Sequence, residues 1–183
     1  MNPVLIVGII VGVLLVIFIA YISMKNNIRR TEIKVDEASA GIDVALQKRY
    51  DVLTKMLDVV KAYTKHEKET IIEVINLRKG MNMSEKAEAT KKIDEGFSKI
   101  NVVAEAYPEL RSSENFKTLQ QAIADTEEHL QAARRMYNAN ISKLNQLVVS
   151  FPTSVVASSM GVTRREFFEV DEAKKEDVKM DFE

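Results

Sequence analysis

Hydrophobic positions divide the chain into one continuous apolar block and a longer stretch in which apolar residues recur at intervals. In the block, residues 4–22, 17 of 19 residues are apolar, the other two are Gly8 and Gly12, and none is charged. A helix of about 20 residues is about 30 Å long, which matches the hydrocarbon core of a bilayer. The pattern therefore predicts an N-terminal transmembrane helix within residues 1–24.

Two other interpretations of this block stay open. A cleavable signal peptide would carry a charged start, a shorter apolar region and a cleavage site with small residues, and residues 20–23 fit such a site poorly. A buried helix of a soluble core is the other alternative. Gly8 and Gly12 also form a small-xxx-small pair that would let two spans pack closely, so a homo-oligomer stays open as well.

Charged residues beside the block set its expected orientation. Lys25, Arg29 and Arg30 follow it before the first acidic residue, Glu32. Because basic flanks are retained on the cytoplasmic side, we expect a single-pass protein of the inner (cytoplasmic) membrane, with the N-terminus outside and the rest in the cytoplasm. The lipid bilayer is thus the first expected partner.

After the block, apolar residues fall at three- and four-residue steps, which is the period of an amphipathic helix. The first such pattern predicts a helix from Thr31 to Leu77, with room for a bend at residues 65–69 and a stop at Gly80. Its expected apolar stripe is Ile28, Val35, Ala38, Ile42, Ala45, Leu46, Leu53, Met56, Leu57, Val60, Tyr63, Ile71, Ile72 and Ile75.

Two further helices follow. Ser84 is the expected N-cap of the second, which should end at Pro108, and the third should begin at Ser112 or Ser113 and run to Phe151. The third keeps a seven-residue repeat, which is typical of a helix that needs a partner helix. The expected stripes are Ile93, Phe97, Ile100, Ala104 and Tyr107 in the second helix, and Phe116, Leu119, Ile123, Thr126, Leu130, Ala133, Tyr137, Ile141, Leu144, Leu147, Val148 and Phe151 in the third, with Arg134 off the stripe.

Short connections between these patterns predict antiparallel neighbours. The expected fold class is therefore all-α: an N-terminal transmembrane helix followed by an up-and-down antiparallel helical bundle of three to four long helices, over residues 25–161. Residues 153–161 suit one short helix. Residues 162–183 are acidic. We expect either a loosely docked or disordered tail that Phe167–Phe168 attaches to the bundle, or a peptide segment that a partner protein binds.

Composition narrows the class of protein. The net charge is -1, and the basic pairs Arg134–Arg135 and Arg164–Arg165 are isolated, which argues against nucleic acid as a partner. The chain has 6 Gly, 3 Pro and no Cys, so it is neither collagen-like nor held by disulfides. The absence of cysteine agrees with a reducing compartment.

Residues that could carry catalysis are few. A zinc site on a helix would need a second histidine four residues after His66, where Thr70 stands, and His129 is the only other histidine. The sequence contains no glycine-rich phosphate-binding loop. The adjacent serines Ser158 and Ser159 are expected in a loop beside a helix end and not in a nucleophile site. We therefore assign no catalytic, cofactor-binding or metal residue and expect no enzyme activity.

Several stretches together resemble the LemA family of bacterial membrane proteins. They lie at residues 42–51, 60–67, 107–110, 114–116, 119–120, 126–127, 133–138 and 151–152, and are spread over most of the chain. One departure is Thr54–Lys55, where the family usually carries Pro-Asn.

The resemblance implies one N-terminal span and a cytoplasmic antiparallel bundle without established enzymatic activity. Family members are often encoded beside other membrane proteins, including a membrane metallopeptidase. We therefore expect a non-catalytic, membrane-tethered helical scaffold with membrane-associated protein partners. The alternative is a regulatory subunit of a membrane enzyme, such as a membrane metallopeptidase, or an envelope enzyme. Arg49 with Asp51, and Glu127 with Arg134–Arg135, are expected as charge pairs between helices.

Overall fold

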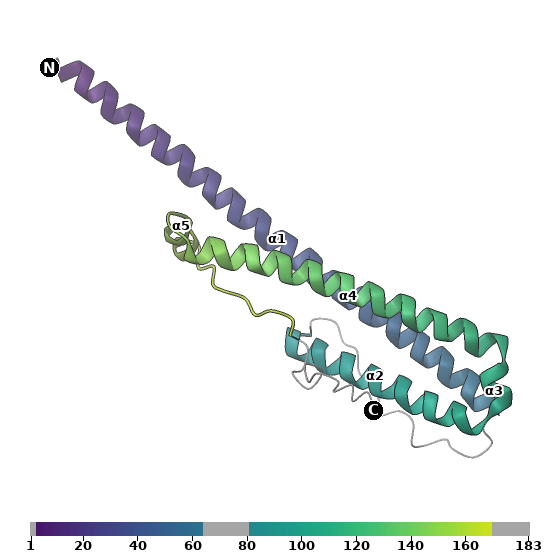
Figure 1. Ribbon diagram of the computed structural model, residues 1–183. Helices are drawn as coiled ribbons and strands as arrows, with labels where there is room; N and C mark the ends of the chain where they lie inside the picture. The colour runs from purple at the N-terminus through teal and green to yellow at the C-terminus, as the bar shows by residue number, and fades with distance from the viewer. Residues whose placement is uncertain (1–2, 64–80, 170–183) are drawn as a thin grey trace, which may run out of the picture. The chain divides into compact units, whose positions relative to one another are not determined.

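The computed structural model describes residues 3–63 and 81–169, and every element in these ranges is a helix (Figure 1). The elements are α1 (Pro3–Tyr63), α2 (Met83–Ala106), α3 (Pro108–Ser112), α4 (Glu114–Val149) and α5 (Thr153–Ser159). The predicted all-α class, with a long apolar N-terminal helix followed by further helices, is confirmed. The bend expected at residues 65–69, the helix stop at Gly80 and the stripe positions at 71–75 lie outside the described residues.

Helix α1 is a single helix of 61 residues that contains both the apolar segment and the first helix of the bundle. The boundary expected between residues 24 and 25 therefore falls inside a helix. No proline follows Pro3 before Tyr63, and Gly41 is the only glycine after Gly12 in that range, so nothing in the local sequence forces a break.

The helices belong to two compact units, and α1 and α4 contribute to both. The first unit holds the described part of Met1–Ala40 together with Met136–Glu166. The second unit holds the described parts of Gly41–Arg135 and Phe167–Glu183. Each unit is described by itself below.

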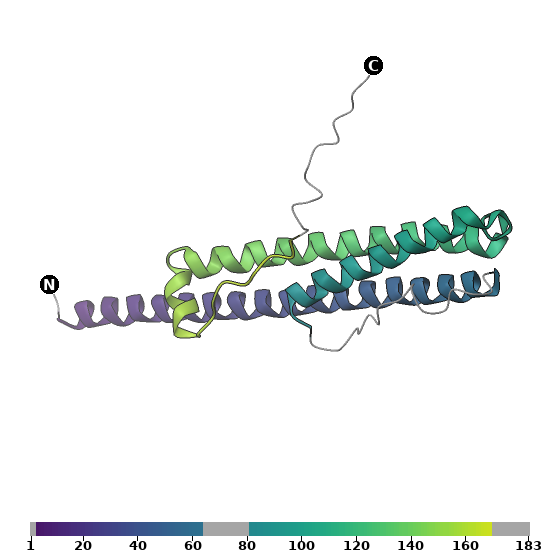
Figure 2. The same ribbon diagram turned by 90° about the horizontal axis from the view of Figure 1, so that it is seen from below.

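In the second unit α1 and α2 run in the same direction, as three contacts show (Figures 1 and 2). Asp43 pairs with Lys86, Arg49 pairs with Asp94, and Leu53 packs against Gly96, so the residue numbers rise together along both helices. The sequence had predicted antiparallel neighbours. That rule holds for short connections, whereas residues 64–82 separate α1 from α2. Helix α4 does run antiparallel to α2, as the hydrogen bond between Gln120 and Asn101 indicates.

The core follows the predicted stripes closely. All expected positions of α1 from Ile28 to Val60 are buried, as are Ile93, Phe97, Ile100 and Ala104 of α2. In α4 the buried stripe positions are Phe116, Thr126, Leu130, Tyr137, Ile141 and Leu144. The predicted burial is wrong at the last position of each stripe described here. Tyr63, Tyr107 and Phe151 are all exposed, and the exposed fraction of Phe151 is 85%. No further helical turn covers the last residues of a helix. Whether the last apolar side chain is buried therefore depends on which other segment packs against the helix end.

Capping residues set where the shorter helices begin. Asn82, not Ser84, caps α2: its side chain accepts a hydrogen bond of 2.8 Å from the Glu85 amide, and the Glu85 carboxylate accepts one of 2.8 Å from the Asn82 amide. This reciprocal pair is a capping box, in which both residues satisfy free backbone donors. Helix α2 ends at Ala106 as expected, but Pro108 then begins the short helix α3, which the apolar pattern does not predict.

At the start of α4, Ser113 Oγ accepts a hydrogen bond of 3.3 Å from the Phe116 amide, in agreement with the predicted start. The short helix expected within residues 153–161 is present as α5.

Residues 162–169 follow α5 and are held by specific contacts. In the first unit, Arg165 forms an ion pair of 2.6 Å with Asp36 of α1, and Asn145 of α4 bonds both the amide and the carbonyl of Arg165. Of the apolar pair expected to attach this segment, Phe168 is buried in the second unit and Phe167 is exposed. Residues 170–183, with the rest of the expected tail, lie outside the described residues.

Candidate functional site

The apolar segment of α1, residues 4–22, is exposed along its whole length. Within the described residues, α1 is the one helix long and apolar enough to cross a membrane, with a mean hydropathy of 3.2 over its most apolar 18 residues, and none of that stretch is buried. A signal sequence near the N-terminus would satisfy the same criteria of length and composition. The segment is therefore a candidate span.

The far end of this segment carries an aromatic and several basic side chains. Tyr21 is partly exposed, and its hydroxyl lies 3.4 Å from Oγ of Ser159 on α5. Arg29 pairs with Glu32 one turn later at 2.9 Å, and both arginines, Arg29 and Arg30, are exposed. Tyrosine and basic residues at the end of an apolar helix are typical of the zone between hydrocarbon and water.

A cluster of charged side chains around two buried arginines lies in the second unit, and we call Arg49, Asp94, Glu127 and Arg134 the arginine cluster. Arg49 of α1 is only 3% exposed. Its Nη2 donates a hydrogen bond of 2.6 Å to Oδ1 of Asp94 on α2, and its other terminal nitrogen forms an ion pair with Glu127 of α4. The cluster therefore joins three helices through one guanidinium.

The expected partner of Arg49 was wrong. Asp51 instead accepts a hydrogen bond of 2.9 Å from Gln47, one turn earlier on the same helix. Residues two apart on a helix point away from each other, so Arg49 and Asp51 could not face the same neighbour.

Arg134 completes the cluster and corrects a second expectation, because it is buried although the sequence placed it off the stripe. Its guanidinium carbon lies 4.6 Å above the centre of the Phe168 ring, and Arg49 lies 5.6 Å from the centre of Phe97. Burial lowers the pKa of Arg134, Glu127 opposes that change, and the positive charge of Arg49 adds to it. Arginine keeps its charge in proteins, so Glu127 partly balances both guanidinium groups.

A further buried basic side chain, Lys86, lies on α2 eight residues before Asp94. Lys86 of α2 is 1% exposed, and its Nζ lies 2.7 Å from Oδ1 of Asp43 on α1. Removing Asp43 takes this carboxylate from the buried Lys86, and removing Asp94 does the same to the buried Arg49, so the observed alignment of α1 with α2 is favoured by both pairs. The pairs therefore define the register of the two helices.

Helical spacing could have identified these residues in advance. Arg49 lies seven residues after Ile42 and seven before Met56, both core positions. Lys86 precedes Ile93 by seven, and Arg134 precedes Ile141 by seven. A charged residue in a heptad core position is the signal of a buried ion pair, and a stripe defined by apolar residues alone omits it.

The residues considered as candidates for catalysis can be placed in the described ranges, except His66. Within the described ranges no group of three or more His, Asp or Glu side chains could hold a metal ion. His129 is exposed on α4, and His66 lies outside the described residues. Ser159 Oγ donates to the carbonyl of Val156 at 2.7 Å, and Ser158 is exposed at the end of α5. In the arginine cluster, Arg49 is paired with Asp94 and Glu127, and Arg134 lies over the Phe168 ring.

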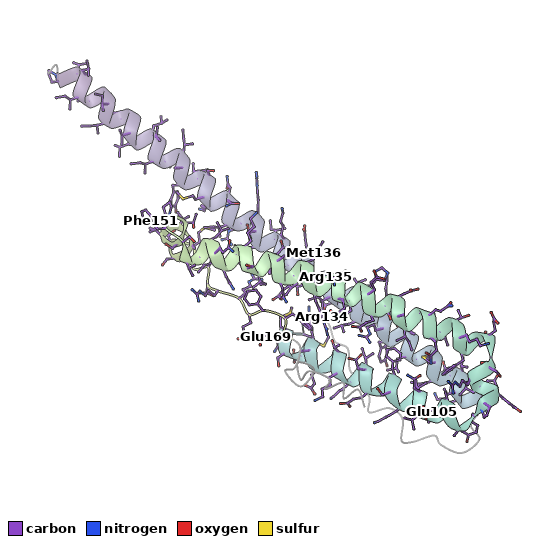
Figure 3. The ribbon with its side chains drawn as sticks, in the orientation of Figure 1. Glu105, Arg134, Arg135, Met136, Phe151 and Glu169 are labelled. Carbon is purple, nitrogen blue, oxygen red and sulfur yellow. The ribbon has the colours of Figure 1, made fainter. Side chains whose placement is uncertain are left out.

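A shallow hollow of about 420 Å³ lies in the second unit where α2, α3 and α4 meet. Its lining includes Glu105, Arg111, Phe116 and Lys117, and Figure 3 labels Glu105 near the end of α2. Charges of both signs line this open hollow, and no single ligand chemistry is favoured.

Comparison with known proteins gives two matches. Residues 38–182 match the sequence model of the LemA family. The chain is also 26% identical over 168 residues to Protein LemA of Metamycoplasma hominis, and the alignment covers 89% of this chain and 77% of that protein. The family match includes all four residues of the arginine cluster and begins after the apolar segment.

Proposed function

The chain belongs to the LemA family, and on that premise we propose that it is a membrane-tethered helical scaffold that binds membrane-associated proteins and catalyses no reaction. Residues 4–22 of α1 cross the bilayer once. The bundle formed by the rest of α1 with α2 and α4 remains on the cytoplasmic side and offers its helix surfaces to partners.

One observation carries the membrane anchor in this proposal. Along α1 every stripe position from Ile28 to Val60 is buried, whereas the apolar side chains of residues 4–22 are exposed on all sides. Each apolar side chain left in water costs about 1.5 to 3 kcal/mol relative to burial. A soluble protein would not retain so large an exposed apolar surface, and a bilayer removes that cost.

The orientation follows from charge. Lys25, Arg29 and Arg30 are exposed just after the apolar segment and can remain among the headgroups on the cytoplasmic face. The buried basic side chains support the proposal that the chain catalyses no reaction. Arg49 and Lys86 are each paired with a carboxylate from another helix.

Extraction from membranes tests the anchor. We expect the full-length chain to stay with the membrane in alkaline carbonate and to be released by detergent. The double variant Val11→Arg/Leu15→Arg should become extractable, because each charge at the centre of a span costs about 2.5 to 3.5 kcal/mol or more. Ile33→Arg/Val44→Arg is the matched control, because both side chains are exposed on the later part of α1.

Release of the unmodified chain by carbonate would overturn the anchor. Intact mass then separates a retained span from a cleaved signal, since the membrane-bound protein should keep the full 20.7 kDa. A membrane-bound species lacking residues 4–22 would contradict the proposal.

Crosslinking in mild detergent tests the scaffold role. The bundle should crosslink to specific membrane proteins through its exposed helix faces, and the same crosslinks should disappear when Arg49 is replaced and the bundle loses its alignment. Crosslinks that survive loss of the bundle structure would argue against a scaffold.

A further inference from the structure

The turn between α4 and α5 exposes several large apolar side chains in the first unit. Phe151 is 85% exposed, Val155 is 63% exposed, and Val149 is also exposed. The sequence pattern had placed Phe151 at the end of a buried stripe, yet α5 buries Val156 and Ala157 instead and leaves the turn uncovered. A cluster of exposed apolar side chains indicates a surface that binds another protein, a ligand or a membrane.

The position of this turn is fixed by α5. The hydrogen bond between Tyr21 and Ser159 joins α5 to the end of the apolar segment of α1. Figures 1 and 2 both show α5 beside α1, and Figure 3 labels Phe151 at the end of α4, where α5 begins. The exposed apolar turn therefore lies at the end of α4 where α5 crosses to the end of the apolar segment of α1.

Charge distribution around the turn is unusual for this chain. No charged residue occurs between Lys143 and Arg164, although 29% of the chain is charged. The charges that bound this stretch are basic, as are Lys25, Arg29 and Arg30 beside the apolar segment. An uncharged apolar tip bordered by basic residues suits the surface of a bilayer with anionic headgroups.

We propose that the turn between α4 and α5 is a second membrane contact, in which Phe151 and Val155 insert into the interface of the same bilayer that α1 enters. This inference rests on the proposed anchor. Burial of the two side chains needs no charged group to leave water, and the neighbouring backbone is already paired in helices α4 and α5. The contact holds the first unit against the membrane surface and limits its rotation about α1.

Tryptophan fluorescence tests the contact directly, because the chain contains no Trp of its own. Phe151→Trp and Val155→Trp, each in the full-length chain, are reconstituted into vesicles of phosphatidylcholine and phosphatidylglycerol. Part of the lipid carries a nitroxide quencher on the acyl chain close to the headgroup. We expect both reporters to lose most of their emission to this lipid and to emit at shorter wavelength than an exposed reporter.

Two control reporters separate this inference from the proposed anchor. Phe18→Trp lies in the apolar segment and should be quenched by lipid if the anchor is correct. Met136→Trp is similarly exposed in the same unit but lies 15 residues, about 22 Å, before Phe151 along α4, and should not be quenched.

The outcomes are distinct. Quenching of Phe18→Trp with no quenching of either turn reporter overturns the second contact and leaves the anchor intact. A shift to shorter wavelength without quenching by lipid, as a second copy of the chain covering the turn would produce, also overturns it. No quenching of Phe18→Trp overturns the anchor and this inference together.

Discussion

Arg49 Nη2 on α1 lies 2.6 Å from Oδ1 of Asp94 on α2, and this contact aligns two helices that are separated by residues 64–82 in the sequence. The Arg49 side chain is 3% exposed, and its guanidinium also pairs with Glu127 on α4. One buried side chain therefore couples all three long helices of the second unit.

Removal of Asp94 should destabilise this unit. We expect Asp94→Ala to lower the free energy of unfolding by about 2 kcal/mol, because a hydrogen bond to a charged group contributes about 1.5 to 3 kcal/mol and the part exposure of Asp94 reduces the effect. Thermal unfolding in detergent, followed by circular dichroism at the helix band, measures the change. Asp51→Ala is the control, since its bond to Gln47 is exposed, and an equal loss in the two variants would contradict the role of the cluster.

Asp94 and Glu127 should also be coupled to each other. Both carboxylates neutralise Arg49, so the double variant Asp94→Ala/Glu127→Ala should differ from the sum of the single variants by about 0.5 kcal/mol or more. A double-mutant cycle on the same thermal transition gives this coupling. Strict additivity would indicate that the two ion pairs act independently.

Two glycines of the second unit should respond in opposite directions to alanine. A Cβ at Gly41 would meet nothing within 4 Å, so Gly41→Ala should stabilise α1 by about 0.5 to 1 kcal/mol. A Cβ at Gly96 would lie 3.0 Å from both methyl carbons of Leu53, a buried side chain, so Gly96→Ala should cost about 1 kcal/mol despite its better helix propensity.

The cause of the Gly96 effect can be tested by making space. Leu53→Val in the Gly96→Ala background should recover part of the lost stability, although Leu53→Val alone is destabilising. If Gly96→Ala stabilises the chain as much as Gly41→Ala does, Leu53 moves freely and the close packing of α1 on α2 is not restrictive.

The N-terminus of α2 depends on Asn82. Asn82→Ala should lower stability by about 1 kcal/mol, since it removes the side-chain oxygen that accepts from the Glu85 amide, while the backbone N–H of residue 82 can still donate to the Glu85 carboxylate. Ser84→Ala should have little effect, because Ser84 is exposed inside the first turn of the helix. Hydrogen exchange of the Glu85 amide should become faster in Asn82→Ala, because this amide loses its acceptor. Faster exchange in Ser84→Ala than in Asn82→Ala would show that Ser84, not Asn82, is the N-cap.

Tyr137 should make the first unit sensitive to alkaline pH. Burial raises the pKa of its phenol above the usual value near 10, with Arg165 acting in the opposite direction. A raised pKa in the folded state means that the folded chain holds this proton more tightly than the unfolded chain. The stabilisation is therefore complete below pH 10 and is lost as the pH rises through the folded-state pKa.

Absorbance of tyrosinate in the ultraviolet measures this titration, and Tyr137→Phe identifies its share among the five tyrosines. The variant should lose the steepest part of the alkaline destabilisation. It also loses the hydrogen bond of 3.2 Å that the hydroxyl donates to the Glu166 carbonyl, so it should be slightly less stable at neutral pH. An unchanged alkaline midpoint would show that Tyr137 does not control it.

Local pattern predicted most helices and most of the core. Apolar steps identified the buried face of α1 from Ile28 to Val60, and proline and serine marked the ends of α2 and the start of α4. These features depend on residues close in sequence, since helix periodicity and capping involve neighbours within one or two turns. The same kind of information did not reveal the short helix α3.

Partners of the buried charges could not be predicted in the same way. Arg49 was expected to act with Asp51, but its partners lie 45 and 78 positions away along the chain. The heptad position of Arg49 shows that it is buried, while the identity of Asp94 and Glu127 depends on the direction of α2 and on the helices that meet at that level. Phe151 illustrates the opposite error, because its stripe position suggested burial and the packing of α5 left it exposed.

The sequence by itself determined that this chain is helical, that residues 4–22 are apolar throughout, and which face of each long helix is buried, because each property follows from side chains within a few turns. Only the tertiary structure decided that α2 runs parallel to α1, which carboxylates neutralise Arg49 and Lys86, and where the turn bearing Phe151 lies relative to Tyr21. Those features depend on contacts between segments far apart in the chain, and helix periodicity alone carries no information about which segments meet.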